Sequence, residues 1–265
     1  MPELTLVNGD CLDVMKEIPS KSIDLIICDL PYGCLTTQGA TSLMYTNKGE
    51  SQNGCAWDIK INLEAFWKEV KRIRKNDNTP TIHFCTTKFG YELIESNKEE
   101  FRYDLVWDKQ RGVSFLSANR MPMRSHEMIY VFSKTGAFYN RKDIKGDFKK
   151  WTVDKTNCKT PKSVQYGGFT NNIIEEGGDG KRCILSVIQE KGGNRKTTGH
   201  PTEKPEELYK FLIERYCPPG GTVLDPTAGS FNSVFTAAKI GMHAIGIEKD
   251  KKFYEKGVER LNAIV

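Results

Sequence analysis

The sequence predicts an α/β protein with a Rossmann-like, mostly parallel seven-stranded sheet and helices on both faces. Short apolar runs rich in β-branched residues recur along the 265 residues. Segments with apolar residues at helical spacing lie between them, and strands that alternate with helices favour a parallel sheet. A hydrophobic content of 38% is sufficient for one sizeable core.

The individual elements follow from these patterns. Strands are expected at about residues 3–7, 23–28, 80–85, 102–107, 127–132, 222–224 and 243–247. The clearest helix begins near Pro205, where an acidic first turn precedes Leu208 and Leu212. Further helices are expected at about 62–75, 88–98, 231–240 and 250–263. In a sheet of this kind, ligands bind outside the carboxyl ends of the strands.

Composition excludes several classes of protein. No apolar run approaches the roughly 18 residues that a membrane span requires, and the amino terminus lacks the basic start and apolar stretch of a signal peptide. We therefore expect a soluble, cytoplasmic protein with no membrane partner. The eight cysteines show no Cys-x-x-Cys pair and no short Cys/His ligand spacing, so reduced structural thiols are favoured over disulfides, and no metal site is predicted.

Positive charge is concentrated in residues 135–199. This segment has 13 Lys and Arg against 7 Asp and Glu, and it holds 10 of the 23 glycines. It is therefore predicted to be a basic, loop-rich insertion, which is either a solvated surface excursion or a surface for a phosphate backbone. The predicted organisation is one domain in two halves, residues 1–134 and 200–265, separated by this insertion.

Asp29-Leu30-Pro31-Tyr32 directly follows the apolar strand at 23–28. By itself this segment is ordinary turn material. It nevertheless places hydrogen-bond acceptors beside an aromatic ring, which suits chemistry on a flat ring that carries an amine. An exocyclic amine is a poor nucleophile, because its lone pair is delocalised. The Asp29 carboxylate and the Leu30 carbonyl can each accept one amino hydrogen and localise that lone pair, while Tyr32 stacks on the ring.

A second strand, at 222–224, is also followed by an aspartate and a proline, here adjacent as Asp225-Pro226. The loop that follows it is predicted to approach a ligand through its backbone at Gly229 and to cap a helix through Thr227 or Ser230. It matches neither the Walker loop nor the Gly-x-Gly-x-x-Gly fingerprint. Glu248, which ends the next strand, has the spacing of an acid that binds a ribose diol. The alternative is that it only caps the helix near Asp250.

Together these segments resemble the amino-methyltransferases of DNA, which transfer the methyl group of S-adenosylmethionine to an exocyclic nitrogen. The family's catalytic motif is Asp/Ser/Asn-Pro-Pro-Tyr/Phe, and Leu30 departs from it in the second place. The family's cofactor motif is Asp-Pro-Phe-x-Gly-Ser-Gly. Here it reads Asp225, Pro226, Thr227, Ala228, Gly229, Ser230 and Phe231, without the aromatic residue and the last glycine.

The order of the motifs is that of the β group of this family. The resemblance implies that Asp10 and Cys11, in Asn8-Gly9-Asp10-Cys11, contact the cofactor adenine. It also implies that Thr202 and Lys204 lie near the methionine end of the cofactor. The alternative for Lys204 is that it only faces solvent. The basic insertion becomes the target-recognition region for double-stranded DNA, and a prokaryotic or phage origin is expected.

The expected reaction is methylation of adenine N6 in a base that has left the duplex, by direct in-line transfer, because Asp in the first motif position is more usual for adenine in the family. Cytosine N4, RNA or a protein glutamine amide as the target, and a non-catalytic nucleic-acid binder, are the alternatives. Methylation at cytosine C5 is disfavoured, since the Pro-Cys pair that it requires is absent. A homodimer and a cognate restriction nuclease are further expectations.

Three other segments have weaker interpretations. His126 and Glu127 suggest acid–base or metal chemistry, but no partner ligand stands at helical spacing, so both are predicted to be structural or to face DNA. The segment from Arg111 to Arg124 is a candidate phosphate-contacting loop. Residues 34–56 are a candidate lid or base-flipping loop, on their position alone.

Overall fold

The computed structural model describes residues 2–32, 59–113, 115, 118–142, 144–145, 181–191 and 203–263. The chain divides into two compact units, of which one comprises Met1–Asn140 with Ser186–Val265 and the other Arg141–Leu185. In the second unit, β6 (Ile144–Lys145) and β7 (Lys181–Arg182) form a two-stranded antiparallel sheet. Everything described below belongs to the first unit.

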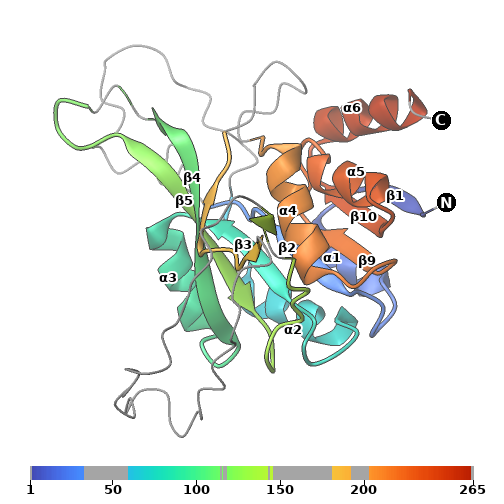
Figure 1. Cartoon of the computed structure of the whole chain (residues 1–265). Coiled ribbons are helices and arrows are strands. Elements are labelled where there is room, and N and C mark those ends of the chain that lie inside the picture. The colour runs from blue at the N-terminus through green and yellow to red at the C-terminus, as the bar shows by residue number, and fades with distance from the viewer. Residues whose placement is uncertain are drawn as a thin grey trace, which may run out of the picture. The chain divides into compact units, whose positions relative to one another are not determined.

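An eight-stranded sheet forms the centre of the first unit (Figure 1). Its strands, in spatial order, are β1 (Leu4–Asn8), β10 (His243–Glu248), β9 (Thr222–Asp225), β2 (Leu25–Cys28), β3 (Thr81–Cys85), β5 (Arg124–Phe132), β4 (Phe101–Val113) and β8 (Val187–Gln189). Only β5 is antiparallel to its neighbours. The prediction of a mostly parallel α/β sheet is therefore confirmed, and all seven expected strands are present.

The eighth strand, β8, was not predicted. It lies inside residues 135–199, the range expected to be an insertion, and it pairs in parallel with β4 through Val106–Asp108. Only three residues long, it carries no alternation that a sequence pattern can reveal. Its position shows that the chain returns to the sheet at Ser186, earlier than the predicted limit of the insertion.

Six helices accompany the sheet in the part of the chain that the structure describes. They are α1 (Cys11–Glu17), α2 (Leu63–Ile73), α3 (Thr87–Ser96), α4 (Glu206–Tyr216), α5 (Asn232–Lys239) and α6 (Lys251–Asn262). Helix α1 was not predicted, because seven residues with two buried side chains give almost no periodic signal. No helix in these described ranges has the length and apolar character that crossing a membrane requires.

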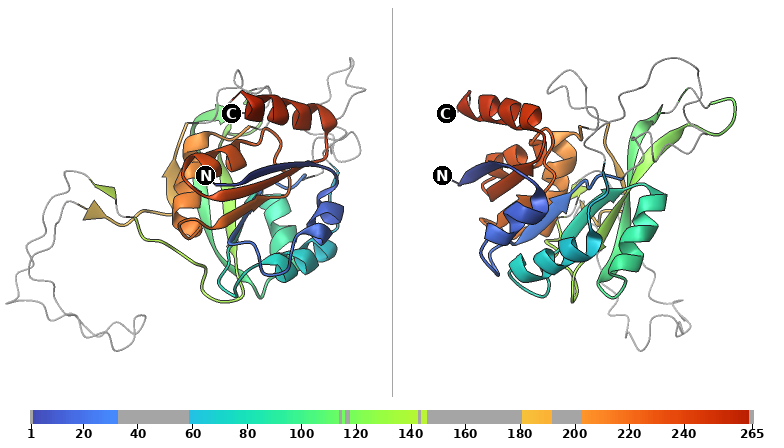
Figure 2. Two further views of the ribbon diagram at one scale, coloured as in Figure 1. Left: turned by 90° about the vertical axis from the view of Figure 1, so that its right-hand side faces the viewer. Right: turned by 180° about the vertical axis from the view of Figure 1, so that it is seen from behind.

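Helices cover both faces of the sheet, and alternate strand residues feed two cores (Figures 1 and 2). In β2, Leu25 and Ile27 pack with α4 and α5, whereas Ile26 and Cys28 pack with α1, α2 and α3. Burial on both faces explains why this strand is an uninterrupted apolar run. The same sandwich holds the carboxyl ends of β1, β10, β9 and β2 side by side at one edge.

The chain leaves β2 and β9, which are neighbours, in opposite directions. After β2 it continues to β3 on one side, and after β9 it continues through α5 to β10 on the other. The loops beyond such a pair of strands diverge and leave a crevice between them, where ligands of open α/β sheets bind. This is where both Asp-containing strand ends, Asp29 and Asp225, are located.

Candidate functional site

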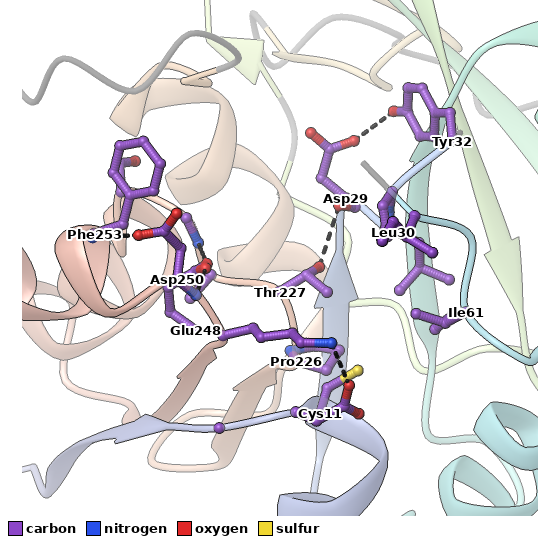
Figure 3. A pocket seen from close by; sticks show the side chains of 18 of the residues that line it. Cys11, Asp29, Leu30, Tyr32, Ile61, Pro226, Thr227, Glu248, Asp250 and Phe253 are labelled. Atoms are coloured by element: carbon purple, nitrogen blue, oxygen red, sulfur yellow. Dashed lines mark hydrogen bonds and ion pairs between the residues drawn. The ribbon is translucent and has the colours of Figure 1, made fainter. Parts of the chain in front are cut away.

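A pocket of about 430 Å³ opens at these carboxyl ends (Figure 3). Its walls come from the ends of β1, β2, β9 and β10 and from the starts of α1, α4 and α6. The predicted site residues that line it are Asp10, Cys11, Asp29, Leu30, Pro31, Tyr32, Lys204, Pro226, Thr227, Ala228, Gly229, Ser230 and Glu248. Segments more than 200 residues apart in the sequence thus converge on one cavity.

Asp29 lines this pocket and is held on both carboxylate oxygens. The Tyr32 hydroxyl donates to Oδ1, and the Lys204 ammonium donates to Oδ2. The Thr227 hydroxyl donates to the Asp29 carbonyl over 3.2 Å, which joins the catalytic segment to the loop after β9. Figure 3 shows Asp29, Leu30 and Tyr32 on one wall of the pocket, with Thr227 reaching toward them. The acceptor group is therefore held in place before a substrate arrives.

Tyr32 is held by its own surroundings as well. Its ring packs against Phe89 of α3, with ring centroids 5.1 Å apart. Burial, with the nearby Asp29 carboxylate, raises the pKa of the Tyr32 hydroxyl well above its usual value. The hydroxyl therefore remains a hydrogen-bond donor to Asp29, and the ring has a defined orientation at the pocket wall.

Lys204 does not face solvent, which excludes the alternative that the sequence left open. Its side chain is 4% exposed, and its ammonium lies 4.7 Å from the centroid of the Phe84 ring and 3.7 Å from Glu127 Oε2. Burial disfavours the ammonium, but the attraction of Asp29 and Glu127 raises the pKa of Lys204 above its usual value. Lys204 is therefore a cation at neutral pH, and it bonds to the predicted catalytic carboxylate.

The two acids beside Lys204 have pKa values that are displaced in opposite directions. Burial is the main cause that raises the pKa of Asp29, and it is opposed by Lys204. Burial also disfavours ionised Glu127, but Lys204 and Lys109 together hold the pKa of Glu127 below its usual value. The sequence had not linked Glu127 to this site, because the contact depends on the pairing of β5 with β3.

The loop after β9 is organised around Asp225, whose side chain does not line the pocket. Asp225 is 2% exposed and accepts hydrogen bonds from the Thr227 amide, over 3.0 Å, and from the Ser233 hydroxyl. Burial raises the pKa of Asp225 to about 7. Asp225 thus holds the conformation of the loop through these two hydrogen bonds. Residues Pro226 through Ser230 line the pocket.

Phe231 stands where the family's motif has a glycine, and it keeps the left-handed backbone that a glycine adopts easily, with φ 60° and ψ 15°. Its ring is completely buried and lies in a slot beside Gly246 and Gly257. A Cβ at Gly257 would lie 2.5 Å from the ring. The missing glycine of the motif is therefore compensated by two glycines elsewhere, which make room for the aromatic side chain.

Glu248 lines the pocket at the end of β10. Its Oε2 accepts from the Gly229 amide at 2.8 Å, and its Oε1 accepts from the Asp250 amide at 2.7 Å. Each carboxylate oxygen retains a second lone pair, so both can still accept from a diol. Asp250, not Glu248, caps α6, because its carboxylate accepts from the amides of Lys252 and Phe253. Burial is the main cause that raises the pKa of Glu248.

Asp10 and Cys11 occupy the start of α1. Asp10 caps this helix through the Leu12 amide at 2.9 Å, and it forms an ion pair of 3.0 Å with Lys249 beyond β10. Cys11 is 6% exposed, and burial raises the pKa of its thiol to about 12. The thiol is therefore neutral at physiological pH and contributes an apolar contact, not a nucleophile.

Several lining residues escaped the sequence prediction. Ile61 and Phe253 add apolar surface to the pocket, and Tyr209 and Lys249 also line it. Phe253 follows Glu248 by five residues, and an aromatic residue on the helix after the acid was the one signal available. Of the predicted residues, Thr202 lies outside the described residues, as do most of the basic insertion and all of the proposed lid at 34–56.

The pocket thus combines apolar walls for a flat ring, a carboxylate with free lone pairs for a diol, and a second carboxylate for an amine. Asp29 follows β2 and Glu248 ends β10, and both line the same pocket, so one ligand can contact both. These are the functional groups that a nucleoside-containing cofactor and an amine-bearing acceptor require.

Comparison with known proteins identifies the family to which the chain belongs. The family model for DNA methylases, of the N6/N4 type, matches residues 23–259. The chain is 29% identical to the type II methyltransferase M.HinfI of Haemophilus influenzae, over 98% of this chain and 68% of that protein. It is 25% identical to the DNA adenine methyltransferase YhdJ of Escherichia coli K12, over 97% of this chain and 82% of that protein.

Solved structures show the same fold. PvuII DNA methyltransferase, which is specific for cytosine N4, has a TM-score of 0.63 at 15% identity, over 98% of this chain and 88% of the other. The complex of M1.HpyAVI with SAM has a TM-score of 0.60 at 17% identity, over 97% and 98% of the two chains. With the family model covering most of its length, the chain belongs to the DNA methylase family.

Proposed function

We propose that this protein is a site-specific DNA methyltransferase that transfers the methyl group of S-adenosylmethionine to adenine N6. The observation that supports this most directly is that Asp29 and Leu30 line the same pocket as Glu248. Methyl transfer requires a donor and an acceptor amine side by side, and this arrangement offers groups for both. YhdJ is named an adenine methyltransferase, which favours adenine over cytosine.

The residues present fit S-adenosylmethionine. Glu248 offers lone pairs for the ribose hydroxyls, and the Gly229 amide fixes its orientation. Cys11, Ile61 and Phe253 offer apolar surface for the adenine. The bound cofactor supplies an electrophilic methyl group on a sulfonium, which is already a good leaving group. The protein therefore mainly has to bring the acceptor nitrogen into line with that methyl group.

Asp29 and Leu30 prepare the acceptor. One amino hydrogen is accepted by the Asp29 carboxylate and the other by the Leu30 carbonyl, which directs the nitrogen lone pair toward the methyl group. Asp29 receives the amino group while bound to Tyr32 and Lys204, through lone pairs that these donors leave unused. The base must leave the duplex to reach this site, at a cost of a few kcal/mol. The proton is then lost to solvent.

The β4–β5 hairpin is the described surface that best suits a phosphate backbone. Strand β4 ends at Val113 and strand β5 begins at Arg124. Arg120, in the connection between them, is exposed. The predicted phosphate-contacting segment is therefore largely the end of a hairpin. The hairpin gives the phosphate backbone of double-stranded DNA a positive contact, and the basic composition of residues 135–199 is a separate reason to expect DNA binding. Binding should weaken as salt rises, in proportion to the phosphates neutralised.

One experiment tests the reaction and the target base together. The purified protein is incubated with S-adenosylmethionine and unmodified DNA, the DNA is digested, and the methylated nucleoside is identified by mass. N6-methyladenosine supports the proposal, and N4-methylcytosine supports the alternative within the same family. Transfer to neither base would refute both. Mapping the modified positions on the same DNA identifies the recognition sequence.

A further inference from the structure

Glu127 is half-buried beside the site but does not line the pocket. It lies on β5 opposite Trp107 of β4, and its carboxylate is 21% exposed. Oε1 accepts from Lys109, whereas Oε2 is buried without a hydrogen-bond partner and lies 3.7 Å from the Lys204 ammonium. A buried carboxylate oxygen without a hydrogen bond is costly, so its retention here needs an explanation.

Asp29, Lys204, Glu127 and Lys109 form a row of alternating charge. Lys204 lies between the two carboxylates, and Lys109 follows Glu127. None of these side chains is more than 21% exposed, so the charges are only weakly screened by solvent. The four charges sum to zero, and the end that meets the pocket is negative. Loss of Glu127 alone would leave a net positive cluster behind Asp29.

The sign of the charge beside Asp29 matters for the proposed reaction. The target nitrogen forms a bond to the methyl carbon as the carbon–sulfur bond breaks, and positive charge passes to that nitrogen until it releases a proton to solvent. Groups that face the nitrogen with negative charge stabilise this transition state, and a net positive cluster opposes it. Lys204 by itself would cancel the charge of Asp29. Glu127 cancels the charge of Lys204 in turn.

We propose that Glu127 is a positioning residue for methyl transfer, which holds the Lys204 ammonium in place and balances its charge, so that Asp29 remains an effective acceptor for the target amino group. This inference rests on the proposed function, since it assigns a role in the same reaction. Glu127 acts through Lys204 and contacts neither substrate nor cofactor.

The test is Glu127→Gln, which keeps the size of the side chain and removes its charge. We expect kcat for DNA methylation to fall on the order of tenfold, as for a charged group that acts through one intervening side chain. Affinity for S-adenosylmethionine, measured by calorimetry, should not change. The matched control is Glu100→Gln, because Glu100 is also a buried carboxylate in an ion pair, 2.9 Å from Arg74, away from the pocket. The control should retain wild-type kcat.

The pH dependence of kcat separates an electrostatic role from a structural one. Glu127 repels the ionised form of Asp29 and so raises its pKa; without that charge, Asp29 stays ionised to lower pH. The acid limb of the profile should therefore move to lower pH in Glu127→Gln, whereas a variant that merely misplaces Asp29 would lose rate with no shift. In the described part of the chain, the titratable groups that interact electrostatically with Asp29 include Lys204, Glu127, Tyr32, Cys28, Cys85, Tyr209 and Asp225.

A second measurement needs no turnover. The Lys204 ammonium can be titrated by NMR of labelled lysine side chains, with Lys204→Met for assignment. In Glu127→Gln it should lose its proton at lower pH than in the wild type, because one of its two carboxylate partners has gone. If wild-type protein methylates DNA but neither kcat, the acid limb nor this titration changes, the role of Glu127 is refuted while the proposed function stands. If wild-type protein transfers no methyl group, the proposed function fails, and the reaction role of Glu127 fails with it whatever the titration shows.

Discussion

Asp29 and Asp225 follow neighbouring parallel strands, and a proline stands close behind each, yet the fold uses them differently. Asp29 is 20% exposed, lines the pocket and is held by the side chains of Tyr32 and Lys204. Asp225 is 2% exposed and is held by a backbone amide and the Ser233 hydroxyl. One carboxylate is presented to a ligand and the other organises a loop. A similar local sequence thus supports a reactive group in one place and a framework group in the other.

The largest difference should appear in activity. Asp29→Asn keeps the shape of the side chain but removes the negative charge that attracts the target amino group. We expect kcat to fall by about a thousandfold, as when a preorganised polar group is removed from an active site. Cofactor affinity, measured by calorimetry, should be largely retained. Near-normal turnover in single-turnover assays would contradict the proposed role of Asp29.

The framework role of the loop after β9 should appear in stability. Phe231→Ala removes a completely buried ring and should lower the free energy of unfolding by about 3 kcal/mol. Gly257→Ala should also destabilise, because its new Cβ meets the Phe231 ring at 2.5 Å. In the double variant, the second change should cost less than it does alone. Urea denaturation of the four proteins measures this coupling, and strict additivity would argue against the slot.

The buried Asp225 carboxylate should make the free energy of unfolding depend on pH. Its pKa in the folded protein, about 7, lies above its unfolded value of 3.8, so the folded state binds more protons between these values. Unfolding free energy should therefore fall as pH rises from about 4 to about 7. Asp225→Asn should flatten this fall while it keeps similar bonds to Thr227 and Ser233. Denaturation at pH 5 and pH 7.5 tests it, and an unchanged slope would show that Asp225 is not the group responsible.

Glu248 both lines the pocket and holds the neighbouring loop through backbone amides. Its substitution is expected to have the smallest effect. Glu248→Gln should weaken S-adenosylmethionine binding by about tenfold, because one charged acceptor is replaced by a neutral amide. Once saturated with cofactor, the variant should turn over nearly normally. Exposed Glu95 on α3 provides a matched control, as Glu95→Gln. Equal affinity in wild type and Glu248→Gln by calorimetry would refute the ribose contact.

Much of the fold was predictable because its signals are local. Most of the seven expected strands are short runs rich in apolar and β-branched residues, and the first turn of α4 is marked by proline and acidic residues. The unpredicted elements, α1 and β8, are short. β8 depends on its pairing with Val106–Asp108, which no property of its own three residues indicates. Phe231 is a similar case, since the space for its ring depends on glycines that are distant in the sequence.

The sequence by itself determined the family resemblance, the parallel sheet and most residues of the pocket, because the pocket is built at strand ends where motif and structure coincide. Only the tertiary structure decided which charges meet. Lys204 was expected at the methionine end of the cofactor, and it bonds to Asp29. Glu127 was expected to be structural or to face DNA, and it lies beside Lys204. Electrostatic partners depend on distance and burial in space, and strand pairing between remote segments sets both.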